Sequence, residues 1–498
     1  MAKSLWGEEF NISTKDDTSA LVQRLADPVV QVSLKRKLSS KTTRLEDKLG
    51  MIESGVMSIL GRYRDNTLII KSKEELHDYI STAISNGIIA IDTETNNSLD
   101  PLTCKIMGAC IYTPGLKQAY IPMNHIDRFI KGKYGYVEKS RGSRYAWQIT
   151  EQELKEEFDR LGNTKIIMHN AKFDYEVIKC TCDCKLSVYW DTMLGAKLLD
   201  ENERAGLKQQ YIEKIDPSVE KYSIEELFSS IEYAIVDPDL FALYAATDAM
   251  MTYKLYEYQL GILSKPENKK LLSLLLNIEM PVMEVAAEME LTGVCIDTEY
   301  AKRLSKKYNK TLAELDERIS EEVDKYSNKI AEWRKTKEAQ ERAEQGFKKT
   351  IGGKTYRYHD ASGGPGDTPY WVEDKTSKQV SLKEEYALGL PGKKSKSDQL
   401  ETPVNLASPQ QLAILLYDVL KVPVVDKKSP RGTGEEILKE IDIPLSKLIL
   451  ERRGLLKLIN TYIDTLPQQT SPRDGRLHAS FNQAGTATGR FSSSEPNL

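Results

Sequence analysis

The 498-residue sequence has little of what defines several common classes of protein. It has six cysteines and no charged-then-apolar leader, which argues against a disulfide framework and for a reducing compartment. No apolar run approaches the length needed to cross a bilayer, so we expect no membrane partner. With only five histidines, sites built from several imidazoles are disfavoured, and carboxylates become the main candidate metal ligands.

The sequence also has no large excess of charge of either sign. Its 70 lysines and arginines nearly balance its 74 acidic residues, which leaves a formal net charge of −4. A polyanion would therefore have to be held by local basic patches rather than by a global positive field. The balance neither supports nor excludes a nucleic-acid partner.

The length predicts two to four domains, and the composition changes along the chain. Residues 1–65 are polar and charged, with an amphipathic helical pattern at 46–60, and we interpret them as an N-terminal extension. From residue 66 to 260, short β-branched runs alternate with helical stretches. This alternation is typical of an α/β domain.

The second half of the sequence is dominated by helical patterns. Residues 271–293 and 300–326 predict long helices, and helical patterning returns at 407–467. Residues 331–400 are poor in apolar side chains and rich in glycine and proline, so we expect an insertion there. We therefore place a mainly helical domain at 261–475 and a separate polar segment at 476–498.

The stretch IIAIDTETNNSLD, residues 88–100, places two carboxylates directly after an apolar run. Residues two apart on a strand project from the same face, so Asp92 and Glu94 can point at one spot. Burying two acids there is costly unless a cation lies between them.

Two further segments offer a carboxylate beside apolar residues. In HNAKFD, Asn170 is suited to be an N-cap and Asp174 lies one helical turn further on. In LFALYAATDAMM, Tyr244 and Asp248 are four apart and share one helix face. Each segment alone is equally consistent with a solvated turn, a helix cap or a surface charge.

Together, the four acids would repel one another and raise one another's pKa unless cations join them. Two Mg²⁺ or Mn²⁺ ions, about 3.5–4 Å apart, would suit these oxygen ligands and would support in-line phosphoryl displacement. Tyr244 would orient the attacking water, because a phenol with an unperturbed pKa of about 10 is a poor base at neutral pH.

The motifs DTET (92–95), HNAKFD (169–174), DTML (191–194) and YAATD (244–248), in this order, resemble those of the tyrosine-bearing branch of the DEDD exonucleases. More narrowly, they resemble the proofreading domain of family A DNA polymerases. The resemblance implies a ribonuclease H-like α/β fold that binds two divalent ions. It assigns Asp92, Glu94, Asp174 and Asp248 as the catalytic metal ligands and Tyr244 as the catalytic tyrosine that positions water.

The same resemblance assigns two DNA contacts within this domain, Asn170 and Leu99. Leu99 would be the wedge against the terminal base of the substrate. The sequence departs from the family here, because NNSLD carries an extra residue between the acidic pair and the leucine. The assignment of Leu99 is therefore looser than that of the metal ligands.

Downstream, residues 261–475, apart from an insertion at about 331–400, resemble the helical thumb of the same polymerases, and 476–498 resemble the start of their palm. Hydroxyl and amide side chains suit phosphate contacts, and basic side chains supply local positive charge. The alternative is a polar turn with ordinary surface charges. The assigned DNA contacts are Arg452, Arg453, Lys457, Asn482, Gln483, Thr486, Thr488, Arg490, Ser492 and Ser493.

The palm and fingers motifs of the family, such as DYSQIE and a late HDE, do not occur in the sequence, and the triplet HDA at 359–361 lies in the predicted insertion. We therefore expect nucleotide addition to need a second polypeptide that carries palm and fingers. A split gene, a split intein and a truncation all remain open. The resemblance implies a cytoplasmic protein, in the host cytoplasm if it is viral.

The leading hypothesis is a 3′–5′ exonuclease and DNA-gripping half of a family A DNA polymerase, which acts in replication. Its partners would be a primer–template duplex and a single-stranded 3′ end. One alternative is a DNA-binding scaffold subunit with a weak or silent exonuclease. Another is a free-standing DEDD nuclease of the RNA-processing type.

Two features are given conservative interpretations. Cys180, Cys182 and Cys184 would align on a strand, but their spacing differs from that of common zinc sites. His169 is interpreted as a packed or stacked ring rather than a catalytic one.

Overall fold

The computed structural model describes residues 44–132, 135–219, 222, 227–228, 231–345, 348–351, 354–359, 370–373, 400–401, 403–486 and 488–498. It also describes two short paired strands, β1 (Ala2–Lys3) and β2 (Glu9–Phe10). Most of the predicted extension at 1–65 therefore lies outside the described residues. The chain divides into two compact units, 1–294 together with 478–498, and 295–477.

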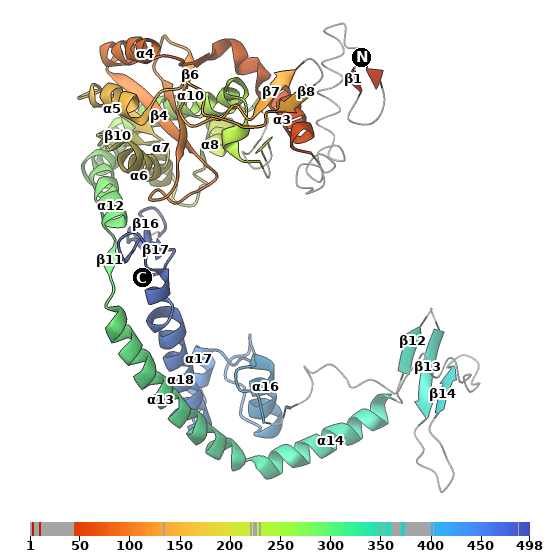
Figure 1. The fold of residues 1–498 in the computed structure, drawn as a ribbon. Coiled ribbons are helices and arrows are strands. Elements are labelled where there is room, and N and C mark those ends of the chain that lie inside the picture. Colours follow the sequence, from red (N-terminus) through yellow and green to blue (C-terminus); the bar gives the residue numbers. More distant parts are fainter. Residues whose placement is uncertain are drawn as a thin grey trace. The chain divides into compact units, whose positions relative to one another are not determined.

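The first unit is built on a mixed six-stranded sheet with the strand order β10-β9-β4-β5-β6-β3. Strands β4, β6 and β10 of this sheet are labelled in Figure 1. The central strand β4 pairs in parallel with β9 and antiparallel with β5. The predicted apolar runs form these strands, which confirms the α/β prediction. Their bounds are β3 (Thr67–Ile69), β4 (Ile88–Thr95), β5 (Ile106–Tyr112), β6 (Gln118–Pro122), β9 (Lys165–Met168) and β10 (Val188–Asp191).

The helices of this unit begin where local signals place them. Ser72 accepts a hydrogen bond from the Glu75 amide at the start of α4, and Thr150 forms a capping box with Glu153 at the start of α5. Gly87 ends α4 with a positive φ of 70°. The helices are α4 (Lys73–Asn86), α5 (Glu151–Asp159), α6 (Ala171–Cys182), α7 (Thr192–Leu199), α8 (Leu207–Lys214) and α10 (Pro238–Leu263).

Helix α10 is the core helix of the first unit. It contacts β3, β4, β5 and β6 and carries buried residues on all of its faces. A helix that is apolar all round is a buried helix, and this explains the long apolar pattern around Tyr244 and Asp248. Asp237 caps its start, with Pro238 in the first turn.

Residues before the predicted boundary at 66 also join this core. The amphipathic pattern at 46–60 forms α3 (Leu45–Leu60), which confirms that helix, and its residues Leu49, Ile52 and Val56 are buried. Helix α3 contacts α10 and the hairpin of β7 (Phe129–Gly132) and β8 (Gly135–Glu138). A short 3₁₀ helix, η1 (Gly61–Asn66), links α3 to β3.

The first unit ends in helices that follow α10 and in a C-terminal hairpin. After η2 (Tyr233–Ile235) and α10 come η3 (Pro266–Asn268), α11 (Lys269–Leu274), the π-helix η4 (Leu275–Glu279) and α12 (Met280–Thr292), which packs on α6. The hairpin of β16 (Ser480–Asn482) and β17 (Ser492–Ser494) returns to this helix pair. The Phe481 amide donates to Glu290 of α12, and Lys172 of α6 donates to the Phe481 carbonyl over 2.7 Å.

The second unit has its own core, formed by α13 and α18, which pack on each other, and by the shorter helices. Its elements are α13 (Thr298–Asp324), α14 (Ser327–Gln345), α16 (Pro409–Ala413), η6 (Ile414–Val419), α17 (Glu435–Glu440), α18 (Pro444–Leu458), η7 (Ile459–Ile463) and η8 (Leu466–Gln469). Short strands are β11 (Val294–Cys295) and β15 (Arg476–Leu477).

The predicted insertion at about 331–400 is partly regular structure. Helix α14 continues to residue 345, and Ile330 and Trp333 pack into the core of the second unit. A three-stranded antiparallel sheet follows, β12 (Lys348–Ile351), β13 (Lys354–His359) and β14 (Tyr370–Glu373), while 374–399 lie outside the described residues. In the part of the chain that the structure describes, no helix is long and apolar enough to span a bilayer.

Candidate active site

Strand β4 delivers the first two acids of the site. Asp92 pairs with Cys110 of β5 and Glu94 pairs with Gly108, and residues opposite one another in an antiparallel pair lie on the same face. Ligand atoms of Asp92, Glu94 and Cys110 all lie within 4.8 Å of one another. The two acids therefore converge as predicted, and the thiol of Cys110 is an additional neighbour that the sequence did not single out.

Asp174 is held against β4 by the residue between the two acids. Its Oδ1 accepts hydrogen bonds from the Thr93 amide over 2.9 Å and from the Thr93 hydroxyl over 2.6 Å. Both residues are buried, so these bonds are shielded from water. Thr93 thus positions the third predicted ligand, which α6 contributes, beside the strand that carries the first two.

Helix α10 brings Tyr244 and Asp248 to the same place, together with a lysine from α8. Lys208 Nζ donates to the Tyr244 hydroxyl oxygen over 2.9 Å and to Asp248 Oδ2 over 2.8 Å. The other oxygen, Asp248 Oδ1, is buried and has no hydrogen-bond partner. No sequence pattern pointed to Lys208, because its position depends on how α8 packs on α10.

Burial and mutual repulsion dominate the electrostatics of the acids. The pKa of Asp92 is raised well above its usual value by burial, and further by Asp174, Glu94 and Asp248. Burial, followed by the charge of Asp248, raises the pKa of Glu94 to about 8. Burial raises the pKa of Asp174 to about 7 against the opposing hydrogen bonds from Thr93. These mutual effects follow from the closeness of the four acids, and their role as metal ligands stays a prediction.

The DTML motif has a structural role. The Asp191 carboxylate accepts from the backbone amides of Asn170 and Ala171 at 3.0 and 2.9 Å, and also from Met193 over 2.7 Å. It therefore ties the starts of α6 and α7 together. Asn170 occupies the N-cap position of α6, as predicted, but with a φ of 59° and without a side-chain cap bond, so Asp191 supplies the acceptor.

His169 is half-buried and lies against Thr192. Its Nδ1 lies 2.8 Å from the Thr192 hydroxyl, and burial lowers its pKa to about 4. This agrees with the conservative interpretation. Leu99, in contrast, is 85% exposed in the loop after β4, where Asn97 is bonded to the Ile231 carbonyl over 3.2 Å. The wedge role of Leu99 stays a prediction.

The basic residues proposed for DNA binding on α18 have contacts within their own unit. Arg452 forms an ion pair with Asp316, and Arg453 donates to the Thr433 carbonyl over 2.5 Å. Lys457 is exposed. Their DNA contacts remain predictions, and those of the two arginines would have to coexist with or replace these bonds.

Several of the C-terminal candidates are hydrogen-bonded to η4 or within their own turn. Gln483 donates to the Glu279 carbonyl over 2.8 Å, Thr486 donates to the Arg490 carbonyl over 2.7 Å, and Asn482 accepts from the Ala484 amide over 3.1 Å. This is what the polar-turn alternative expects, and DNA contact is untested for the whole group. Of the remaining candidates, Ser493 accepts from the Leu498 amide, Thr488 bonds to Thr486, Ser492 is half-buried and Arg490 is exposed.

The three clustered cysteines lie around the end of α6 and not on a strand. Cys180 is exposed, whereas Cys182 and Cys184 are buried. Among the described residues, the group found with metal-ligand spacing is that of Asp92, Glu94 and Cys110.

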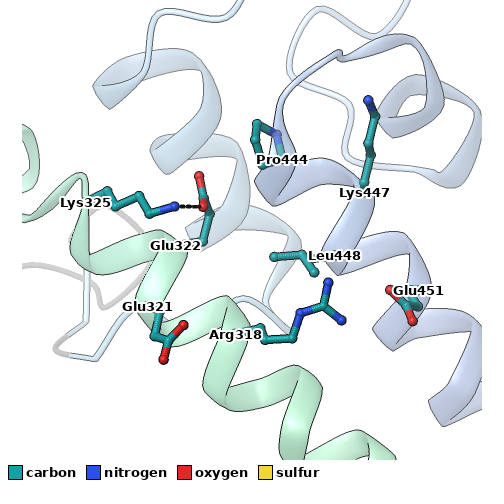
Figure 2. A pocket seen from close by; sticks show the side chains of 8 residues that line it. All are labelled: Arg318, Glu321, Glu322, Lys325, Pro444, Lys447, Leu448 and Glu451. Atoms are coloured by element: carbon teal, nitrogen blue, oxygen red, sulfur yellow. Dashed lines mark hydrogen bonds and ion pairs between the residues drawn. The ribbon is translucent and has the colours of Figure 1, made fainter.

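A separate pocket of about 420 Å³ lies between α13 and α18 in the second unit (Figure 2). Its lining is mostly charged, with lysine, arginine and glutamate side chains that partly pair with one another, such as Lys325 with Glu322. It contains none of the predicted site residues. The lining residues are Arg318, Glu321, Glu322, Lys325, Pro444, Lys447, Leu448 and Glu451.

Comparisons with known proteins agree with the geometry. Residues 67–260 match the family model described as 3′-5′ exonuclease, and residues 380–498 match that of DNA polymerase family A. DNA polymerase I of Chloroflexus aurantiacus is 28% identical over 443 residues, which cover 86% of this chain and 37% of the relative. A thermostable DNA polymerase I of Thermus thermophilus is 47% identical over 102 residues, or 19% of this chain and 12% of the relative.

One solved structure shares the fold, the POL domain of Pol1 from M. smegmatis in complex with DNA primer-template and dNTP. It has a TM-score of 0.53 and 18% identity, and the match covers 87% of this chain and 55% of that chain. The exonuclease domain of the present chain thus fits a ribonuclease H-like fold.

The fold, the acidic cluster and these matches define a domain at 67–260 that is similar to 3′-5′ exonucleases, a type that uses divalent metal ions. A second segment, residues 380–498, is similar to part of the DNA polymerases of family A. The chain spans 37% of the length of the first relatives. The comparisons do not support the predicted second polypeptide, and a viral origin is not confirmed.

Proposed function

We propose that the chain removes nucleotides one at a time from a single-stranded DNA 3′ end, as the proofreading exonuclease of a DNA polymerase that acts in replication. The observation that carries this proposal is the convergence of Asp92, Glu94, Asp174 and Asp248 from three separate elements beside Tyr244. A frayed end would enter more readily than a paired one, because unstacking a mismatched base costs less.

The donor set fits divalent cations. The cluster offers carboxylate oxygens, which Mg²⁺ and Mn²⁺ prefer, and Asp248 Oδ1 is a buried acceptor that lacks a partner. We propose Asp92, Glu94, Asp174 and Asp248 as the ligands of two such ions. When bound, the ions supply activation of the attacking water and stabilisation of the leaving oxygen.

The protein's own contribution is to place and orient groups. Burial raises the pKa of Tyr244 well above its usual value, so its hydroxyl stays protonated and cannot act as a base at neutral pH. Its hydroxyl hydrogen can instead orient water. Thr93 fixes Asp174, and the β4 backbone fixes Asp92 relative to Glu94, so the acids need little rearrangement to bind cations.

We further propose that residues 261–475 act as a thumb that grips primer–template duplex and that 476–498 begin the palm. The match of residues 380–498 to DNA polymerase family A supports this assignment. A cytoplasmic location belongs to the same proposal.

The test is digestion of a 3′-labelled primed template in Mg²⁺ or Mn²⁺ by Asp92→Ala and Asp248→Ala variants. We expect both to reduce digestion to background while duplex binding remains measurable. Asp239→Ala is a matched control, since Asp239 is an exposed acid in the first turn of the same helix as Asp248.

Digestion by the double variant at the wild-type rate would refute the assignment of the ligands. An inactive wild-type chain that still binds duplex would favour the scaffold alternative. A preference for ribose at the 3′ end would favour the RNA-processing alternative.

A further inference from the structure

Lys208 is the basic side chain that lies inside the acidic cluster, and the proposed function gives it no role. It comes from α8, which packs on α10, and buried Gln210 and Tyr211 on α8 hold the helix in place. Its side chain is only 19% exposed. Lysine side chains are rarely buried this deeply unless they are paired.

Lys208 has acidic and aromatic neighbours. Its Nζ lies 2.8 Å from Asp248 Oδ2 and 2.9 Å from the Tyr244 hydroxyl oxygen. It also lies 4.3 Å from the centre of the Tyr244 ring and 5.2 Å from that of Tyr222. The two rings meet edge to face at 6.1 Å, so they form two walls around the ammonium group.

We propose that Lys208 is the resident cation of this active site, a positioning residue that neutralises part of the acidic cluster before metal ions bind and fixes the roles of Asp248 and Tyr244. The expected effect of Lys208 on catalysis rests on the proposed function. Its effect on the charge of the acidic cluster does not depend on that function.

The first role follows from how the two oxygens of Asp248 are shared. Oδ2 accepts from Lys208, whereas Oδ1 is buried without a partner. Oδ1 is therefore the Asp248 oxygen that would be available to a metal ion, since Lys208 already donates to Oδ2. In this arrangement Lys208 is no competitor for the ligand atom, and it holds the carboxylate plane in one orientation.

The second role concerns the hydroxyl of Tyr244. An ammonium group has only donors, so the Tyr244 oxygen must accept from it, and the hydrogen of Tyr244 remains available to donate. The water that attacks the phosphate must be held by a hydrogen bond of fixed direction. Lys208 would thus make Tyr244 a donor with a defined direction.

The third role is electrostatic and extends beyond Asp248. The Lys208 ammonium group lies 2.8 Å from Asp248 Oδ2, so its positive charge compensates part of the negative charge of the ionised cluster. Without the lysine, the metal-free cluster would carry one more unit of uncompensated negative charge. This extra negative charge would lower the stability of the folded protein without metal, and it would strengthen the binding of divalent cations.

The test compares Lys208→Met with Lys208→Arg, which keeps the charge, and with Lys214→Met. Lys214 lies on the same helix and is paired with Glu203, so it controls for the loss of an ion pair on α8. The readouts are the melting temperature in EDTA, the Mn²⁺ dissociation constant measured by electron paramagnetic resonance, and exonuclease kcat and KM.

For Lys208→Met we expect a lower melting temperature in EDTA and Mn²⁺ binding that is about tenfold tighter. We also expect kcat to fall with little change in KM, because Tyr244 loses its fixed direction. Lys208→Arg should restore the Mn²⁺ affinity, and Lys214→Met should leave it at the wild-type value. If Lys208→Met does not fold, Lys208→Gln keeps a donor without the charge, and tighter Mn²⁺ binding is expected there too.

Mn²⁺ affinity and metal-free stability at wild-type values in a folded, uncharged Lys208 variant would overturn the inference. This outcome is distinct from a failure of the proposed function. If the wild-type chain digests no DNA but the uncharged variant binds Mn²⁺ more tightly, the proposed exonuclease function is wrong and the proposed electrostatic role of Lys208 is supported.

Discussion

At the scale of single residues, the four acids differ in which neighbouring groups compensate their negative charge. Asp174 accepts hydrogen bonds from Thr93, and Asp248 is paired with Lys208. Among the hydrogen bonds and ion pairs of the described residues, none of this kind involves the carboxylates of Asp92 and Glu94. Burial and repulsion therefore dominate at the pair on β4. This difference makes the metal-free protein sensitive to pH.

We predict that the metal-free protein loses stability as the pH rises from 6.5 to 8.5. The folded pKa values of Asp174 and Glu94, about 7 and about 8, exceed the unfolded values, so the folded state binds more protons in this window. Thermal unfolding in EDTA should show the fall, and saturating Mn²⁺ should remove it. Glu94→Gln should flatten the profile in EDTA, and a steep fall that persists in this variant would argue for another group.

Tyr244→Phe should slow digestion by about 10- to 100-fold, because only the orienting hydroxyl is lost while the ligands remain. Single-turnover digestion measures the rate, and Mn²⁺ affinity is the control, expected to be unchanged. A complete loss of activity would instead give the hydroxyl a direct part in proton transfer.

The four acids that lie together could be picked out from the sequence because each one follows or interrupts an apolar run that forms a strand or a buried helix. Lys208 and Cys110 could not be found in this way. Cys110 enters the site through the register of β4 with β5, and Lys208 through the packing of α8 on α10. Register and helix packing are tertiary properties that local patterns do not encode.

At the scale of elements, one carboxylate joins the starts of two helices. Asp191 accepts from amides at the start of α6, which carries Asp174, and of α7. Asp191→Ala leaves these buried donors without an acceptor and should cost about 2–4 kcal/mol of unfolding free energy. Urea denaturation measures this cost.

Thr150→Ala is the matched control for that experiment, since it removes the exposed cap of α5 and should cost about 1 kcal/mol. A cost of Asp191→Ala no greater than that of the control would mean that water replaces the carboxylate.

The elements themselves were predicted unevenly. Strands β4, β5, β6 and β9 follow from their apolar runs, because buried strands are continuous in apolar residues. The helical part of 331–345 falls within the predicted insertion, because α14 is highly charged in sequence, although Ile330 and Trp333 pack into a core. A highly charged helix and a polar insertion look alike in composition.

At the scale of the whole molecule, the two units have separate cores, and the proposed metal ligands belong to one of them. We predict two calorimetric transitions, of which Mn²⁺ raises only the one that belongs to the exonuclease unit. Binding at 100-fold excess over Kd stabilises the folded form by about 2.7 kcal/mol. Asp92→Ala should abolish the shift, and a metal-induced shift of both transitions would mean that the units unfold together.

The first unit is discontinuous along the chain, because residues 478–498 return to it after the whole of 295–477. Glu290 and Glu279, in the part of the unit that is synthesised first, accept hydrogen bonds from Phe481 and Gln483. During translation, every residue of the intervening unit must leave the ribosome before these bonds can form. The β16–β17 hairpin can therefore pack on the first unit only after residues 295–477 have been synthesised, although most of the first unit is made earlier.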